Sequence, residues 1–362
     1  MTTSRLRSLD FFRGAIMVLL MLESTGLYAG MLKVGNPVLT AIGTQFEHHP
    51  WAGLRFWDLI QPGFMFIAGT ALAFSLSRQQ AAGVPWGPSF RKALIRSGWL
   101  FFWGVLDYAV RPGGLSFELW DVLTQLSFTL LVAFLIFRWS PAAQIAVSIG
   151  ILVLAEALYR LSGIPGFDQP FVDQHNFGNY VDLLLMNKIN PEGWVAINCL
   201  STAAHTIWGA VAGRWLLSTT PETTKTRWLV AAGAVALIIG FSLDATTTPI
   251  IKRIATTSFV FASGGFCLIA LAACHWIIDV RDHQRGLQFF TIVSMNSLFI
   301  YLFIEIIGNR WFNGYVGALS NGLLGLVGVP LAPTRLLTAL TIFALEWQLC
   351  AFLYRRQIFF KA

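Results

Sequence analysis

Two adjacent histidines, His48 and His49, are the side chains of this sequence best suited to acid–base chemistry. They lie just before a long apolar run, and an imidazole can take up and release a proton near neutral pH. One of them could serve as a general base or a nucleophile while the other packs. A zinc site would need three or four ligands at fixed spacing, and no third ligand is evident nearby in the sequence, so we expect no metal.

Further polar side chains interrupt apolar runs, where they cost free energy and often mark a function. Asp58 could orient a histidine, or it could only begin a helix as its N-cap. Asn296 could donate a hydrogen bond to a substrate, or it could only bond a neighbouring helix. His205 lies within an apolar run, where it could contact a substrate or remain a packed core histidine. The residues alone leave these alternatives open.

The elements that must position these residues are membrane helices. Of the 362 residues, 56% are hydrophobic and 12% are charged, whereas soluble domains carry roughly 25% charge. No polar stretch is long enough for a separate soluble domain. We therefore expect residues 1–362 to form one all-α, polytopic transmembrane bundle. The four cysteines lie in or beside apolar runs and are interpreted as packing residues.

Apolar segments of about 20 residues are long enough to cross a bilayer as helices. The sequence predicts ten such spans, at 11–31, 57–77, 93–110, 119–137, 142–161, 195–218, 227–244, 256–280, 289–310 and 334–356. The Gly-rich apolar segment 315–331 could be an eleventh span or a re-entrant hairpin.

The distribution of basic residues predicts the orientation of the bundle. With ten spans, most of the 25 lysines and arginines fall on one face, from Arg5 near the start to Lys361 near the end. The positive-inside rule then places both termini in the cytoplasm. Basic residues in cytoplasmic loops also explain the net charge of +7. The lipid bilayer is therefore an expected partner, and nucleic acid is not.

Three long connections, 32–56, 162–194 and 311–333, lie on the opposite, external face in this topology. Loops of this length usually have a function or are disordered. They contain aromatic, Asn and Asp residues such as Trp51 and Asp182. That mixture suits a hydroxylated or amino substrate, but it also suits an interfacial aromatic belt. The sequence has no Gly-rich phosphate loop, no G-x-S-x-G and no H-E-x-x-H motif.

Several motifs resemble the transmembrane acyltransferase family, which includes heparan-alpha-glucosaminide N-acetyltransferase and its bacterial relatives. The longest are RLRSLDFFRG at 5–14, HHPWAGL at 48–54 and DLIQPGFMFIAG at 58–69. Shorter matches cover most of the chain, namely NYVD at 179–182, PEG at 191–193, GAVAG at 209–213, PIIK at 249–252, MNS at 295–297 and LYRRQIF at 353–359. Their order and spacing carry the resemblance more than any single motif does.

The resemblance implies transfer of an acetyl group from cytoplasmic acetyl-CoA to a sugar acceptor on the far side of the membrane. The family's active-site histidine lies three residues before a tryptophan, which here gives His48, three before Trp51. The family also has an asparagine late in its first helix, where this chain has Ser24. The neighbouring residues are closer to a bacterial subgroup than to the lysosomal enzyme. We therefore expect a protein of the bacterial inner membrane that does not act on heparan.

The resemblance also leads to a hypothesis for the roles of single residues. His48 would deprotonate the acceptor or carry the acetyl group transiently, Asp58 would orient the imidazole, and Asn296 would stabilise the oxyanion. Basic residues on the cytoplasmic face would bind the phosphates of the coenzyme, and the candidates are Arg91, Lys92 and Arg96. The residues expected to contact the acceptor are Ser24, His49, Trp51, Asp182 and His205.

A proton-coupled sugar or amino-sugar transporter is the main alternative, because Glu23, His205 and Glu305 could relay protons within the membrane. A purely structural membrane scaffold explains the bundle but not the long aromatic loops. The sequence names neither the acceptor nor the number of subunits, and a homodimer stays open.

Overall fold

The fold was described from a computed structural model, which places residues 6–111 and 114–360. Arg5 and Lys361, which contributed to the predicted motif and charge distribution, lie outside these ranges. Within them every regular element is helical, apart from one isolated bridge between Ala52 and Ile251. The prediction of an all-α bundle is confirmed for this part of the chain.

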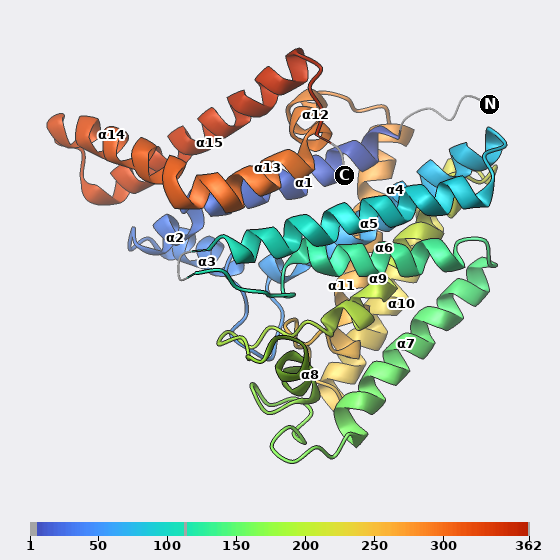
Figure 1. Cartoon of the computed structure of the whole chain (residues 1–362). Coiled ribbons are helices and arrows are strands. Elements are labelled where there is room, and N and C mark those ends of the chain that lie inside the picture. Colours follow the sequence, from blue (N-terminus) through green and yellow to red (C-terminus); the bar gives the residue numbers. More distant parts are fainter. Residues whose placement is uncertain (1–5, 112–113, 361–362) are drawn as a thin grey trace.

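The longer connections between the helices lie before η1, between α5 and α6, on both sides of the small helix α8, and between α10 and α11 (Figure 1). The helices are α1 (Arg7–Ser24), α2 (Leu27–Leu32), α3 (Pro37–Gln45), η1 (Phe56–Leu59), α4 (Ile60–Ala81), α5 (Trp86–Ala109), α6 (Val122–Ile136), α7 (Pro141–Leu161), α8 (Phe177–Met186), α9 (Asn198–Leu216), α10 (Glu222–Thr246), α11 (Thr257–Cys274), η2 (His275–Val280), α12 (Leu287–Met295), α13 (Ser297–Phe303), η3 (Ile304–Phe312), α14 (Asn313–Leu326) and α15 (Leu331–Arg355).

In the part of the chain that the structure places, five helical segments are long and apolar enough to cross a membrane. They are Phe56–Ala81, Pro141–Leu161, Glu222–Thr246, Thr257–Val280 and Leu331–Arg355. A sixth is obtained if α12 and the helix Ser297–Leu326, which bend by 72° relative to each other, count as one span. These helices are those of an integral membrane protein. Every segment predicted as a span is largely helical, although 11–31 and 289–310 are each broken into more than one helix, and the count of ten stays a prediction.

The first predicted span and the segment 315–331 differ in detail from the expectation. The helix that begins the chain ends at Ser24, and Gly26, with a φ of 77°, separates it from the short helix α2. A left-handed backbone of this kind suits glycine and stops a helix. The segment 315–331 forms most of α14, which turns back into α15 as a helical hairpin at one edge of the molecule (Figure 1).

The core lies where α4 and α9 cross closely. A Cβ on Gly69 would meet the carbonyl oxygen of Thr206, and one on Gly209 would meet that of Phe66. Glycine therefore allows the two backbones to touch, as small residues commonly do between membrane helices. Helices α6 and α11 pack around this pair and contribute the buried rings of Phe134 and Phe259, among others.

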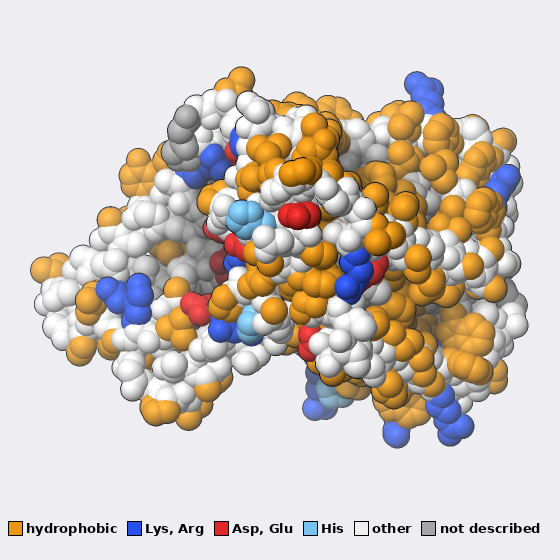
Figure 2. All heavy atoms as spheres, turned by 90° about the horizontal axis from the view of Figure 1, so that it is seen from below, with side chains coloured by type: hydrophobic (Ala, Val, Ile, Leu, Met, Phe, Trp, Pro, Cys, Tyr) orange, Lys and Arg blue, Asp and Glu red, His pale blue; other side chains and the backbone are white. Residues whose placement is uncertain are grey.

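The outer surface is apolar over large areas. Figure 2 shows hydrophobic side chains spread over much of one face, with acidic and histidine side chains near its middle. Ile238 on α10 is 66% exposed and Val153 on α7 is 63% exposed. Such contiguous apolar exposure is expected of a surface that faces lipid rather than water.

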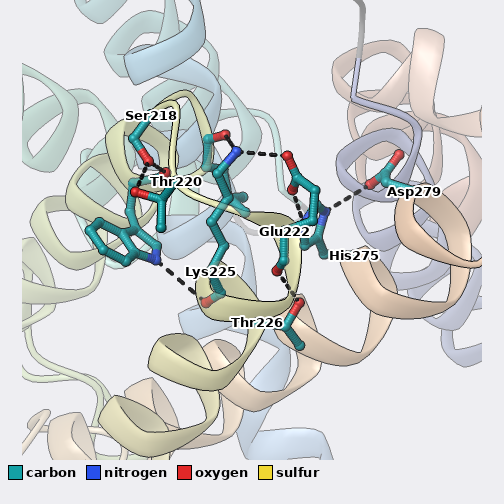
Figure 3. Close-up of polar contacts among 9 residues, drawn as sticks. Ser218, Thr220, Glu222, Lys225, Thr226, His275 and Asp279 are labelled. Carbon is teal, nitrogen blue, oxygen red and sulfur yellow. Dashed lines mark hydrogen bonds and ion pairs between the residues drawn. The ribbon is translucent and has the colours of Figure 1, made fainter.

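One polar cluster joins the start of α10 to the π-helical turn η2. The His275 Nε2 lies 2.8 Å from Glu222 Oε2 and its Nδ1 lies 3.3 Å from Asp279 Oδ2. Lys225 donates to Glu222 Oε1 at 2.8 Å and to the carbonyl of Leu216 at 2.8 Å (Figure 3). Figure 3 shows Lys225 and His275 both directed at Glu222. The cluster ties the start of α10 to η2, which continues α11, far along the chain from His48.

Candidate functional site

Two loops from opposite halves of the chain build the candidate site, one before α4 and one between α10 and α11. The bridge between Ala52 and Ile251 joins them, and the Gly53 N–H donates to the carbonyl of Ile250 at 2.8 Å. Gly53 has a φ of 140°, and a Cβ there would collide with the ring of His49. Glycine thus lets the His49 imidazole pack over this turn.

His48, Asp58 and Lys252 meet where these loops join. The Nδ1 of His48 lies 3.0 Å from Asp58 Oδ1 and 3.1 Å from Lys252 Nζ. Lys252 Nζ lies 3.8 Å from the same oxygen of Asp58. Nδ1 thus has two partners, and Nε2 has no hydrogen bond within residues 6–111 and 114–360. Nε2 is therefore the ring nitrogen that can act on a molecule beside it.

The Asp58 carboxylate is fixed by backbone donors as well as by His48. Its Oδ2 accepts hydrogen bonds from the N–H of His49 at 3.3 Å and the N–H of Arg55 at 2.9 Å. The Arg55 guanidinium also donates to the carbonyl of His48 at 3.0 Å. The Asp58 side chain is only 1% exposed, whereas that of His48 is 35% exposed. A buried carboxylate with this many donors is held rigidly and can orient the imidazole.

Burial lowers the pKa of both His48 and Lys252. It lowers the pKa of His48, and the ammonium of Lys252 lowers it further, so the imidazole is neutral at pH 7. Burial lowers the pKa of Lys252 to about 8, while Asp58 acts in the opposite direction. The Lys252 Nζ also lies 5.3 Å from the centre of the Trp194 ring, which favours its charged form.

The imidazole of His48 opens into a cavity of about 250 Å³, which we call the His48 cavity. Its polar wall consists of Glu23, Gln61, Arg111, Asp121, Gln125, Lys252 and Glu305, and its aromatic wall of Trp57, Tyr108, Trp120 and Trp194. The ring of Trp194 meets that of His48 edge-on at 5.5 Å between centroids. Aromatic faces beside convergent polar groups are typical of sites that bind small polar molecules.

A second cavity, of about 390 Å³, lies between α1, α4, α5, α6 and α13, and we call it the arginine cavity. Arg13 and Arg96 line it together with mostly aliphatic side chains. Arg13 donates from Nε to Ser294 Oγ at 2.9 Å, and Ser294 also lines the cavity. Phe360, near the C-terminus, closes another part of its wall.

Phe64, Val122 and Tyr301 line both cavities, so these three side chains form a wall that the cavities share. The Tyr301 hydroxyl donates to Asp121 Oδ2 at 2.7 Å. Asp121 in turn caps α6 by accepting from the N–H of Leu123 at 2.7 Å. A hydrogen bond from α13 to the N-cap residue of α6 therefore helps to hold the shared wall.

Only part of the predicted site comes together. His48 and Asp58 are in contact, as expected for an orienting carboxylate. Asp58 is not an N-cap, because it is the third residue of η1 and accepts from the N–H of Arg55, which is the N-cap residue. Arg96 lines the arginine cavity. Arg91 and Lys92 are exposed on α5 and line neither cavity. The structure thus separates the three basic residues that were grouped by their position in the sequence.

Asn296 lines neither the His48 cavity nor the arginine cavity. It lies at the bend between α12 and α13, where its amide donates to the carbonyl of Ile358 at 3.0 Å and accepts from the N–H of Phe360 at 3.1 Å. Both ends of the amide are therefore used by the C-terminal segment. Asn296 therefore has structural partners away from the cavity that holds His48, and the oxyanion contact expected of it stays a prediction.

The residues expected to contact the acceptor mostly have structural partners. His49 does not line the His48 cavity, and its contribution to the site is its backbone N–H. The indole of Trp51 donates to the carbonyl of Phe171 at 2.7 Å and packs away from the cavity. Ser24 bonds the carbonyl of Met21, and its neighbour Glu23 lines the cavity instead.

Asp182 and His205 are also buried away from the cavity. Asp182 accepts from the indole of Trp120 and from the N–H of Ala196, each at 2.9 Å, so it positions a cavity residue without reaching the cavity itself. The Nε2 of His205 lies 2.8 Å from Ser263 Oγ, inside the core between α9 and α11. His205 therefore fits the packed core histidine that the sequence left open.

Sequence reasoning missed Lys252, Trp194 and Arg13 as members of the site. Lys252 is the last residue of the PIIK motif and Trp194 directly follows PEG, but neither motif indicates a role for these residues. Arg13 lies in the first motif. Motif position was the available signal, but nothing in the sequence indicated which of its residues would face a cavity.

Comparison with known proteins gives two relatives with the same name. The chain is 24% identical to heparan-alpha-glucosaminide N-acetyltransferase of Mus musculus over 377 residues, and 24% identical to that of Homo sapiens over 376 residues. These alignments cover 85% and 84% of this chain, but the chain spans only about half the length of these relatives, 54% and 53%. No family model matches the chain. The similarity confirms the resemblance found in the motifs as that of a distant homologue.

Proposed function

We propose that this distant homologue of the N-acetyltransferases is a transmembrane acetyltransferase, in which acetyl-CoA enters through the arginine cavity and the acceptor binds in the His48 cavity. The observation that carries the proposal is the shared wall of Phe64, Val122 and Tyr301 between an arginine-lined, largely aliphatic cavity and a polar, histidine-bearing one. A coenzyme with charged phosphates and a thin, flexible arm suits the first, and a polar acceptor suits the second.

His48 would act as the general base of the transfer. The acceptor amine or hydroxyl attacks the thioester carbonyl and gives its proton to Nε2 of His48. The carbon–sulfur bond then breaks, and the coenzyme thiolate takes that proton from Nε2. The products are the acetylated acceptor and free coenzyme thiol, and His48 returns to its neutral form. Transfer through a transient acetyl-histidine on Nε2 uses the same atoms in two steps.

Several features support this order of events. Asp58 contacts Nδ1, the nitrogen that would not react, as an orienting carboxylate should. The arginine cavity is lined by residues near both termini, Arg13 and Phe360, and the predicted topology has these termini in the cytoplasm. In that orientation the coenzyme enters from the cytoplasm and the acceptor from the opposite face.

The transporter alternative is less well supported. Glu23 and Glu305 line the His48 cavity, but His205 lies in the core and lines none of the cavities found in the part of the chain that is placed. His205 is therefore separate from the cavity that Glu23 and Glu305 share, which weakens the proton relay expected of the three residues. The names of both relatives also favour a transferase.

The proposal is tested by incubating the purified protein with acetyl-CoA and a panel of amino and neutral sugars, and by measuring free thiol. Acceptor-dependent thiol release that disappears in His48→Ala is the expected result. Absence of release with every sugar, together with sugar uptake into proteoliposomes without coenzyme, would overturn the transferase in favour of the transporter.

A further inference from the structure

The two partners of His48 Nδ1 require opposite protonation states of this nitrogen. Asp58 Oδ1, at 3.0 Å, is an ionised acceptor and needs a proton on Nδ1. Lys252 Nζ, at 3.1 Å, is a donor when charged and needs a lone pair on Nδ1. A neutral imidazole carries one proton, and a ring nitrogen that holds it cannot accept a hydrogen bond. The protonation of Lys252 must therefore decide which form His48 takes.

The two forms differ in reactivity. When Lys252 is an ammonium, it donates to Nδ1, and the single proton of the imidazole lies on Nε2. Nε2 then has no lone pair to accept a proton from an acceptor molecule. When Lys252 is a neutral amine, Nδ1 holds the proton and donates it to Asp58. Nε2 then presents its lone pair to the His48 cavity, as a general base or nucleophile requires.

We propose that Lys252 is a positioning residue that selects the tautomer of His48, so that the site becomes reactive only as Lys252 loses its proton. The inference rests on the proposed transferase function and adds its regulation by pH. Lys252 can exert this control because its side chain is only 7% exposed and the bridge between Ala52 and Ile251 holds its loop against that of His48.

The other charged groups around Lys252 fix where this change occurs. Asp58 stabilises the ammonium, whereas Arg253 destabilises it and burial destabilises it most. Arg55 faces the backbone of His48 and is paired with Glu47 at 3.7 Å. From the opposite wall, the cavity presents Glu23, Arg111, Asp121 and Glu305. The result is a pKa for Lys252 of about 8, close enough to neutrality for the pH outside a cell to act on it.

The sign of the pH effect follows directly. Below its pKa Lys252 is charged and His48 carries its proton on Nε2, so transfer is slow. Above that pKa transfer is fast. Because about one tenth of a group is deprotonated one unit below its pKa, transfer should rise about tenfold between pH 7 and pH 9.

The tautomer is measured directly by ¹⁵N NMR of the full-length protein labelled at its histidines, with the His48 signals assigned by their loss in His48→Gln. Wild-type His48 should change from the Nε2–H to the Nδ1–H form between pH 7 and pH 9. Lys252→Met, which removes the charge and keeps the apolar stem, should show the Nδ1–H form throughout this range. One tautomer in both proteins at every pH would overturn the proposal, whether or not the protein is a transferase.

The pH dependence of thiol release provides the second readout. An acceptor amine titrates equally in all variants, so the ratio of wild-type to Lys252→Met rates is measured, and it should rise about tenfold from pH 7 to pH 9. Arg253→Met, at the adjacent residue, is the matched control. It should move the midpoint of the pH dependence of thiol release towards alkaline pH, because it removes a charge that destabilises the ammonium of Lys252. A flat ratio in a protein that does transfer acetyl groups would contradict the role of Lys252 and leave the transferase intact.

Discussion

The His48 cavity and the arginine cavity share three wall residues but differ in almost every other respect. The first has charged side chains on several sides and is lined by His48 and Lys252, which both contact the buried Asp58. The second is largely aliphatic, with two arginines. A polar, preorganised site suits chemistry, and an apolar channel with a few cations suits the binding of a long anionic ligand. The comparison predicts that substitutions in the two cavities affect different kinetic constants.

The largest expected effect is that of His48→Ala. Loss of a general base costs about 100- to 10,000-fold, so kcat for acetyl transfer should fall by this amount while the protein still folds. Thiol release by the purified variant measures it. His49→Ala is the control, since His49 contributes only its backbone N–H to the site and should lose far less. An equal loss in both variants would contradict the assignment of His48.

Asp58→Asn should have the next largest effect. The amide keeps the shape of the carboxylate but removes the charge that faces Nδ1 of His48 and Lys252. Misorientation of the imidazole should lower kcat by about 100-fold, with little change in KM for acetyl-CoA. Steady-state kinetics separate the two constants. A rise in KM for the coenzyme at unchanged kcat would mean that Asp58 belongs to the binding site of the coenzyme.

Arg96→Ala addresses the other cavity and should show the opposite pattern. Loss of one charge-assisted contact to phosphate, about 1.4 kcal/mol, should raise KM for acetyl-CoA about tenfold and leave kcat near its wild-type value. Arg91→Ala, on the same helix but outside the cavity, is the matched control and should leave both constants unchanged. Equal effects of the two substitutions would show that charge at the membrane surface, and not the cavity, attracts the coenzyme.

Tyr301→Phe should have the smallest effect, and it acts on the wall between the cavities. It removes the hydrogen bond to Asp121, worth about 1 kcal/mol, and keeps the ring that lines both sides. Changes of up to about fivefold in both kcat and KM for acetyl-CoA are expected. If only one constant changed, Tyr301 would belong to one cavity rather than to their boundary.

Local patterns predicted the helices well, because runs of apolar residues of bilayer length have few other stable structures in lipid. The break at Asn296 was not predictable. Its amide bonds the chain near Phe360, 64 residues later, and nothing in its own segment signals this contact. A polar residue in an apolar run indicates a cost, but only tertiary structure shows whether a substrate or the protein itself satisfies it.

The site was predictable to the extent that it is local. His48 and Asp58 are ten residues apart, and their contact follows from one turn before a helix. Lys252 is 204 residues from His48 and reaches it through a loop that no periodic pattern describes. Contacts between distant loops also explain why Trp51, which was expected to contact the acceptor, lies away from the His48 cavity. Trp194, from a different loop, packs against His48 in its place.

The most direct test of the two-cavity account is to locate the coenzyme by cryo-electron microscopy of His48→Ala with saturating acetyl-CoA, because this variant should bind the coenzyme without consuming it. The account predicts the adenine nucleotide near Arg13 and Arg96, and the thioester at the wall of Phe64, Val122 and Tyr301, on the side of residue 48. A coenzyme bound with its nucleotide in the His48 cavity, or on a surface that leads to neither cavity, would contradict it.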